Sequence, residues 1–348
     1  MDESFCMVPF NRSNLTAIPI QDPAILAWSY LTGALCMIGI VTNLTVLSVV
    51  CASPQLRKGA GIFIEHLLFC HLALCLIAFP MIISRVYETT ITATTNIPSC
   101  SSCRYQHILH VLLNNLVNWS DGMLAVNRLV AIYYPSKFRT FNRRPVHYVC
   151  IVLCWLCTLA YSFPPLFGHL AQYKMSPLGT CGFTNGTRTF VVIMYLDTFS
   201  PIVLAVWAGW VIIRRGRTRN QVATMRRCIQ RDLPLYGRPS LPSINTNSFN
   251  ERQKRTSKML VTSFAFTLAC QLPQYVTMLT NHSSRHPRMA VWFWCLAVVQ
   301  FAATPIIFVV MNHDYQRLTM DLLKRLRGGS GSMARPVTPT KTAAPNKF

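Results

Sequence analysis

The chain has 348 residues, of which 51% are hydrophobic and only 13% are charged, and its formal net charge is +22. About a quarter of the residues in a soluble domain are charged, so this chain lacks the polar surface of a water-soluble fold. A strongly basic chain can bind nucleic acid. Here the apolar residues instead fall into runs long enough to cross a bilayer. We therefore expect an integral membrane protein with no nucleic-acid partner.

Seven such runs follow one another along the chain, separated by polar segments. They predict transmembrane helices at about 24–51, 61–86, 103–134, 147–170, 188–213, 258–280 and 289–311. The third run is the most polar, because it carries His110, three asparagines and Asp121. A polar helix persists in a membrane when other helices enclose it. The expected fold is an all-α, seven-transmembrane helix bundle with this third helix at its centre.

The distribution of basic residues predicts the orientation. Alternate polar segments hold two, four, twelve and seven Lys or Arg residues, which is 25 of the 33 in the chain. The positive-inside rule places these segments in the cytoplasm and the N-terminus outside. We expect an extracellular N-terminus at 1–23, a bundle at 24–311 and a third cytoplasmic loop at about 214–258. The middle of that loop is Arg-, Pro- and Ser-rich, which is typical of disorder.

An amphipathic helix is predicted after the last run. Tyr315, Leu318 and Leu322 recur at helical spacing with basic residues between them. This pattern predicts a helix at 312–327 that lies on the anionic lipid of the inner leaflet. The tail at 328–348 is expected to be disordered.

Glycosylation sequons agree with this orientation. Asn-x-Ser/Thr motifs in the polar segments begin at Asn11, Asn14, Asn185 and Asn281. All four motifs lie in segments that the distribution of basic residues places outside, where glycosylation occurs.

Motif residues along the runs carry a family resemblance. In chain order they are Asn43, Cys103, Arg128 after Asn127, Trp155, Pro201, Cys270-Gln271-Leu-Pro273 and Thr304-Pro305-Ile-Ile-Phe308. With these motifs in order, the chain resembles the rhodopsin-like (class A) G-protein-coupled receptors over about residues 24–327. Asn127-Arg128-Leu129 and the Pro164-Pro165 pair resemble the melatonin-receptor-like and insect Moody-like group in particular.

The resemblance implies a disulfide and a coupling site. It implies that Cys103 pairs with Cys181 in the second outer loop, with Cys100 as the rival partner. It also implies that Arg128 and Asn127 form the G-protein coupling site. The alternative for Arg128 is that its side chain extends to lipid phosphate.

The resemblance also implies an activation switch with altered residues. Its positions are Asn43, His71, Asp121, Pro201, Gln271, Pro273, Thr304, Pro305 and Phe308. His71 and Thr304 stand where the family has the carboxylate and amide of a sodium site, so we expect no sodium site, no other metal and no cofactor. Asp121 needs a partner if charged, and His71 is one candidate. The alternative is a protonated Asp121 bonded to a neighbouring backbone or amide group.

The implied ligand pocket lies in the outer half of the bundle. Its residues are His110, Asn114, Asp197, Gln274, Tyr275 and Trp294. His110 replaces the aspartate of amine receptors, and Val298 replaces the lysine of retinal pigments, which disfavours both ligand classes. Asp197 either orients the ligand or makes a structural bond to a facing helix. Trp294 can also serve as an interfacial residue.

The expected function is that of a plasma-membrane receptor. Its expected partners are an extracellular ligand, a heterotrimeric G protein, arrestin and membrane lipid. The sequence shows no nucleophile–base pair, phosphate loop or metal cluster, so no enzyme activity is expected. One alternative is a receptor-like protein with weak or arrestin-biased coupling, because the switch residues are altered. A transporter or channel is the competing class, but we see neither inverted repeats nor a charged pathway.

Overall fold

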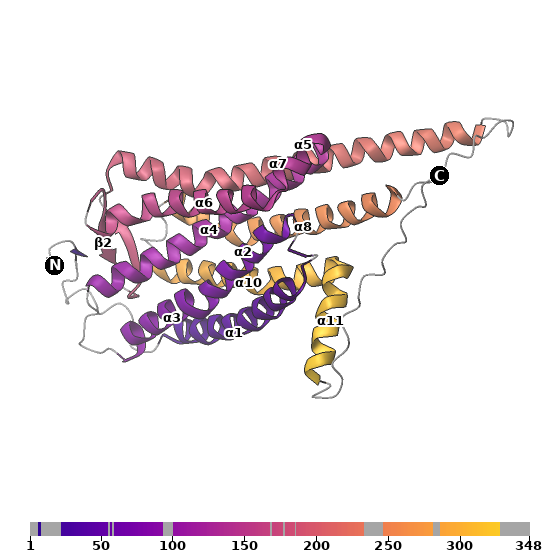
Figure 1. Ribbon diagram of the computed structural model, residues 1–348. Coiled ribbons are helices and arrows are strands. Elements are labelled where there is room, and N and C mark those ends of the chain that lie inside the picture. The colour runs from indigo at the N-terminus through magenta and orange to yellow at the C-terminus, as the bar shows by residue number, and fades with distance from the viewer. Residues whose placement is uncertain are drawn as a thin grey trace.

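A computed structural model describes residues 6–7, 22–54, 56–57, 59–92, 100–167, 169–176, 178–184, 186–232, 246–280 and 286–327. These residues form a bundle of long helices with a small sheet at one end (Figure 1). The elements are β1 (Cys6–Met7), α1 (Pro23–Ala52), α2 (Gly61–Ala73), η3 (Leu74–Ala78), α3 (Phe79–Tyr87), η4 (Glu88–Thr92), α4 (Cys100–Tyr133), α5 (Pro135–Phe141), α6 (Arg144–Leu166), β2 (Gln172–Met175), β3 (Cys181–Thr184), α7 (Arg188–Asp232), α8 (Thr246–Leu279), α10 (Pro287–Met311) and α11 (His313–Arg327).

Seven helical segments correspond to the seven predicted runs. The second is α2 to η4 taken together, in which η3 and η4 are π-helical turns. Five segments are long and apolar enough to cross a membrane by length and composition alone, and α4 and α8 are not among them. Polar residues explain the shortfall, since α4 carries Asn114, Asn115 and Asn118 and α8 carries Gln271 and Gln274.

One predicted boundary differs from the structure. The apolar part of α7 ends at Arg214, close to the predicted start of the third cytoplasmic loop, but α7 continues as a helix to Asp232 and α8 begins at Thr246. The middle of that loop lies outside the described residues. The fourth helix ends at Leu166 rather than near 170. Pro164 and Pro165 occupy its last turn and lack the N–H groups that helical hydrogen bonds require. The four predicted glycosylation sites, Asn11, Asn14, Asn185 and Asn281, and the tail at 328–348 lie outside the described residues.

Helix α1 is joined to α10 along its length by polar contacts. Asp22 caps the start of α1 and forms an ion pair of 2.9 Å with Arg288. Trp28 Nε1 donates to the Val291 carbonyl at 2.6 Å. Further along, Asn43 Nδ2 donates to the carbonyls of Gly39 and Phe301 at 2.8 and 2.9 Å. Buried side-chain amides are stable when both helices satisfy them, so these bonds fix α1 against α10.

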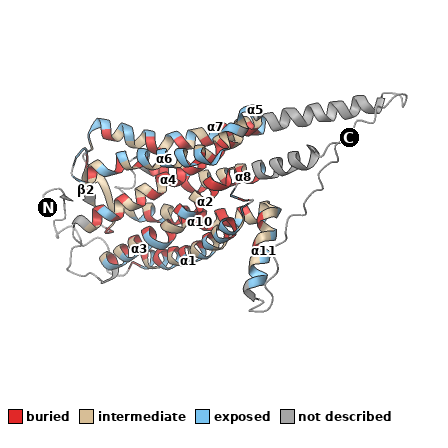
Figure 2. Ribbon diagram, viewed as in Figure 1, coloured by how far each residue is buried: buried red, intermediate tan, exposed pale blue. Residues whose placement is uncertain are grey.

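Helix α4 occupies the centre of the bundle, as its polarity predicted. It packs against α2, α6, α7 and α8. At Gly122 the approach to α7 is close, since a Cβ there would lie 3.3 Å from Pro201 Cβ. Figure 2 shows buried residues on the inner helix faces and exposed residues on the outer faces. Many exposed residues are large and apolar, such as Val203 and Trp210 on α7. An apolar exterior of this kind suits a lipid environment.

The two ends of the bundle carry different structures. At one end β1, β2 and β3 form a three-stranded sheet beside the N-terminus. At the other end α11 turns away from the bundle axis (Figure 1). Tyr315, Leu318 and Leu322 of α11 pack against the core, whereas Arg317 and Lys324 are exposed. The prediction of an amphipathic helix after the last span is confirmed.

Candidate functional site

A disulfide joins the outer end of α4 to the sheet. Cys103 on α4 is bonded to Cys181 at the start of β3, with 5.7 Å between their Cα atoms. The predicted pairing is therefore present, and Cys100 is not the partner of Cys181. The bond brings β3 against α4, where His107 packs edge-on to Phe183 with ring centroids 4.6 Å apart.

Two of the predicted pocket residues lie together below the sheet. The His110 ring on α4 lies 5.9 Å from the Trp294 ring on α10. On its other side it packs edge-on against Phe79 of α3 at 5.2 Å. His110 Nδ1 is buried and has no hydrogen-bond partner among the described residues. Trp294 thus faces α4 from α10, while Asn114 and Gln274 are half-buried on α4 and α8.

Asp197, the acid of the predicted pocket, is bound to α4. Its Oδ2 accepts a hydrogen bond from Asn115 Nδ2 at 2.9 Å, and its Oδ1 accepts one from Trp119 Nε1 at 2.8 Å. The side chain is buried on α7. Because both carboxylate oxygens are already occupied, the geometry favours the structural bond over the ligand-orienting role. No motif in the sequence marks Asn115 or Trp119 as a donor to Asp197.

Replacing Asp197 by asparagine should destabilise the ligand-free receptor. The amide presents only one acceptor oxygen, so one of the two donors on α4 loses its bond. Bonds to charged groups contribute about 1.5–3 kcal/mol each, and an unpaired buried donor costs a similar amount. Thermal unfolding of the purified receptor should show a lower midpoint for Asp197→Asn than for the control Asp321→Asn on the exposed side of α11. An unchanged midpoint together with weaker agonist binding would instead support direct ligand contact.

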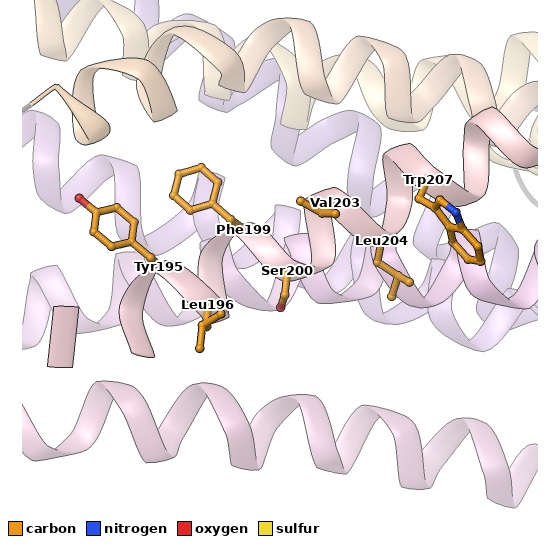
Figure 3. Close-up of a pocket in the computed structure, with 7 residues that line it drawn as sticks. All are labelled: Tyr195, Leu196, Phe199, Ser200, Val203, Leu204 and Trp207. Carbon is orange, nitrogen blue, oxygen red and sulfur yellow. The ribbon is translucent and has the colours of Figure 1, made fainter. Parts of the chain in front are cut away.

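A shallow groove of about 420 Å³ lies on the outer face of α7 and is not the predicted pocket. All seven of its lining residues belong to α7, from Tyr195 to Trp207 (Figure 3). In Figure 3 Leu196 and Ser200 point away from Tyr195 and Phe199 along this face. Leu196 is 61% exposed, whereas Asp197 beside it is 8% exposed and faces α4. The groove therefore opens to the bundle's apolar exterior.

A chain of polar side chains crosses the bundle and includes Tyr275, one of the predicted pocket residues. The Tyr275 hydroxyl on α8 donates to Asn118 Oδ1 on α4 at 3.1 Å and also contacts Gln271 Oε1. Gln271 Nε2 donates to Gln300 Oε1 on α10 at 2.7 Å. Three helices are thereby linked through Gln271, the residue at the predicted switch position. No motif in the sequence marks Gln300 as the partner of Gln271.

His71 and Asp121 do not pair, so the first of the two alternatives given for Asp121 does not hold. His71 is fully buried, and neither of its ring nitrogens has a hydrogen-bond partner among the described residues. Its ring packs instead against Phe301 at 5.0 Å. Asp121 is also buried, and its Oδ2 has no hydrogen-bond partner among the described residues. A buried unpaired carboxylate is costly, which favours the protonated form.

The other predicted switch residues occupy the interior of their helices. Pro201, Thr304, Pro305 and Phe308 are buried, and Pro273 is half-buried. Thr304 Oγ1 donates to the Gln300 carbonyl at 2.9 Å, so its hydroxyl is used within α10.

Hydrogen bonds through the imidazole of His66 join α2, α4 and α6. We call the set of His66, Trp155 and Ser120 the clamp at His66. Trp155 Nε1 donates to His66 Nε2 at 2.9 Å, and His66 Nδ1 lies 2.8 Å from Ser120 Oγ. Ser120 Oγ donates its own hydrogen to the Leu116 carbonyl at 2.7 Å. The Ser120 oxygen must therefore accept from His66, which places the imidazole proton on Nδ1. A family motif marks Trp155, but no motif in the sequence marks its partner His66.

Arg128 lies at the end of α4 that faces α11. It makes no ion pair with any described residue, and its Nε is buried without a hydrogen-bond partner. Asn127 does not reach it, because Asn127 Nδ2 lies 3.4 Å from His147 Nε2 on α6. Burial raises the pKa of the Tyr315 phenol on α11, while the positive charge of Arg128 nearby acts in the opposite direction. No carboxylate among the described residues therefore forms an ion pair with Arg128.

A family comparison covers most of the chain. Residues 42–308 match the sequence model of the family described as 7 transmembrane receptor (rhodopsin family). The fold is similar to squid rhodopsin, with a TM-score of 0.70 and 17% identity over 88% of each chain.

Individual relatives are distant. The chain is 22% identical to G-protein coupled receptor moody of Drosophila melanogaster, covering 87% of this chain and 52% of that protein. It is 24% identical to the GQ-coupled rhodopsin of Mizuhopecten yessoensis, covering 70% and 47%. It is 22% identical to human G-protein coupled receptor 26, covering 83% and 88%. The chain therefore spans about half the length of the first two relatives.

Proposed function

The chain belongs to the rhodopsin family of seven-transmembrane receptors, and on this basis we propose that it transmits an extracellular ligand signal to a heterotrimeric G protein. The observation that carries the proposal is Arg128, a half-buried cation whose Nε is buried without a hydrogen-bond partner and which has no acidic partner in the described part of the chain. Such a charge is costly to bury, so a second arrangement in which it meets a partner is favoured. Its position at the α11 end, which carries the basic residues, suits a cytoplasmic partner.

We propose that the ligand is neither an amine nor retinal. His110 stands at the position where amine receptors carry an acid, and it packs against Phe79 and Trp294. Val298 is fully buried on α10, and that helix contains no lysine to hold retinal. We propose a ligand that enters from the outer side, at a multi-pass receptor in the plasma membrane, with the membrane-surface helix at 312–327 bound to inner-leaflet lipid.

The test is receptor-dependent guanine-nucleotide exchange. Membranes from cells expressing the receptor with single G-protein types should exchange nucleotide faster, at rest or with ligand, than membranes without it. Recruitment of arrestin without exchange would favour the arrestin-biased alternative, which the altered residues Gln271 and Phe308 motivate. A ligand-dependent membrane current with neither response would favour a transporter or channel.

Sodium should not modulate this receptor. A ligand shifts a conformational equilibrium only by binding one state more tightly. Position 71 holds a buried imidazole in place of a carboxylate, and an imidazole is not a sodium ligand. Agonist affinity should therefore stay constant when sodium is replaced by a large organic cation at fixed ionic strength. A clear loss of affinity in sodium that disappears in Asp121→Asn would assign a sodium site to Asp121.

A further inference from the structure

Four cysteines lie on the outer side of the bundle: Cys6, Cys100, Cys103 and Cys181. The structure joins two of them, Cys103 and Cys181. Nine further cysteines are free thiols along the helices, and Cys228 lies on the extension of α7 beyond the bundle. An oxidising compartment that joins one outer pair favours joining the second. Cys6 and Cys100 are the two outer cysteines that remain.

The backbone places both residues at the same corner of the molecule. Cys6 in β1 is opposite Tyr173 in β2, and Met175 in β2 is opposite Cys181 in β3. Cys181 is bonded to Cys103, and Cys100 begins α4 one helical turn earlier. Figure 1 shows β1, the sheet and the beginning of α4 at the same end of the bundle. A continuous set of pairings thus connects the strand of Cys6 to the helix of Cys100.

Strand β1 needs an additional attachment to keep its place. It has two residues and pairs in parallel with β2 alone. Parallel pairing is less stable per residue than antiparallel pairing, and strands this short contribute little by themselves. A covalent bond from β1 to α4 would supply the missing constraint.

We propose that Cys6 and Cys100 form a second outer disulfide, which fastens the N-terminal strand to the start of α4. Each thiol loses its hydrogen as the S–S bond forms. The two electrons and two protons pass to a disulfide oxidant of the secretory compartment, which is reduced to two thiols by exchange through a mixed disulfide. Two adjacent disulfides would then hold β1 and β3 to the same helical turn.

The proposed bond has a consequence for the outer surface. Tyr173, opposite Cys6, lies 5.1 Å from Phe183 and 6.0 Å from His107 between ring centroids. This aromatic set covers the outer end of α4. Fastening β1 beside it would hold the N-terminal strand next to Tyr173 and the aromatic residues packed around it.

Peptide mapping of the wild-type receptor tests the proposal without any substitution. Trypsin cleaves after Arg12, Arg85, Arg104, Lys174 and Arg188, and it leaves the four cysteines in three peptides, 1–12, 86–104 and 175–188. After alkylation and removal of N-glycans, these three should remain joined without reductant and separate on reduction. Release of peptide 1–12 with an alkylated Cys6 would overturn the proposal.

Thiol labelling of intact cells distinguishes the pairing, because peptide 86–104 contains both Cys100 and Cys103. A membrane-impermeant maleimide should label neither the wild type nor the double variant Cys6→Ser/Cys100→Ser. Each single variant should gain one label at the partner left behind. Two labels on the double variant would show that Cys6 and Cys100 are each bonded to Cys103 or Cys181 in the wild type, which rejects the pairing proposed. If the variants fail to reach the surface, the wild-type peptides still decide whether Cys6 is joined to this group.

Discussion

Replacing Arg128 by alanine should abolish basal and ligand-stimulated nucleotide exchange while leaving the amount of receptor at the cell surface unchanged. In the structure this guanidinium makes no ion pair with a described residue. Its Nε is buried without a hydrogen-bond partner, so removing the charge takes away a cost rather than a stabilising contact, and the fold should tolerate alanine. The proposed partner of the charge is the G protein, so exchange should fall to the level of cells without receptor.

Two further variants separate a specific role of Arg128 from general charge. Arg143→Ala removes an exposed positive charge at the start of α6, on the same end of the bundle, and should leave exchange intact. Arg128→Lys keeps the charge but loses the planar guanidinium group, which can form two parallel hydrogen bonds to one partner. Full activity of Arg128→Lys would favour a simple contact with lipid phosphate. Unchanged exchange in Arg128→Ala would contradict the coupling assignment.

Replacing Cys181 by serine should remove most of the receptor from the cell surface. The disulfide to Cys103 closes a loop across 78 positions of the sequence. Loss of a native disulfide of this kind costs about 2–5 kcal/mol, which is a large part of the stability of a folded protein. Surface labelling should show the loss, and thermal unfolding of the remaining receptor should show a lower midpoint.

The control for this variant is Cys157→Ser, which changes an exposed free thiol on α6. It should behave as wild type. Cys103→Ser should match Cys181→Ser, and the double variant should be no worse than either, because all three remove the same bond. Wild-type surface levels and an unchanged midpoint in Cys181→Ser would show that the bond does not stabilise the receptor.

The helical fold could be predicted from the sequence because a bilayer allows few solutions. A membrane-spanning backbone must satisfy its hydrogen bonds internally, so each long apolar run predicts a helix. The polar third run was predicted at the centre for the same reason, and α4 lies there. The short sheet could not be predicted, because β1 has two residues and pairs with a strand far away in the chain.

Partners of the buried polar groups could be predicted only in part. A motif places Asp197 on its helix, but only the rotation of α7 against α4 brings it to Asn115 and Trp119. His71 was likewise one candidate partner for Asp121, but its ring packs on Phe301 and its nitrogens have no hydrogen-bond partner among the described residues. The disulfide could be predicted because Cys103 and Cys181 match a family motif. No such motif marks the partners of a packing contact.

The clamp at His66 restricts what its position can hold. One neighbour, Trp155, is a donor only, and the other, Ser120, has already given its hydrogen to the Leu116 carbonyl. The residue between them must accept on one side, donate on the other and carry no charge. Asparagine and glutamine share that polarity with neutral histidine. Leucine fills a similar space but satisfies neither neighbour, and lysine offers donors alone. Hydrogen-bond direction, more than size or hydropathy, therefore sets the range of side chains acceptable at position 66.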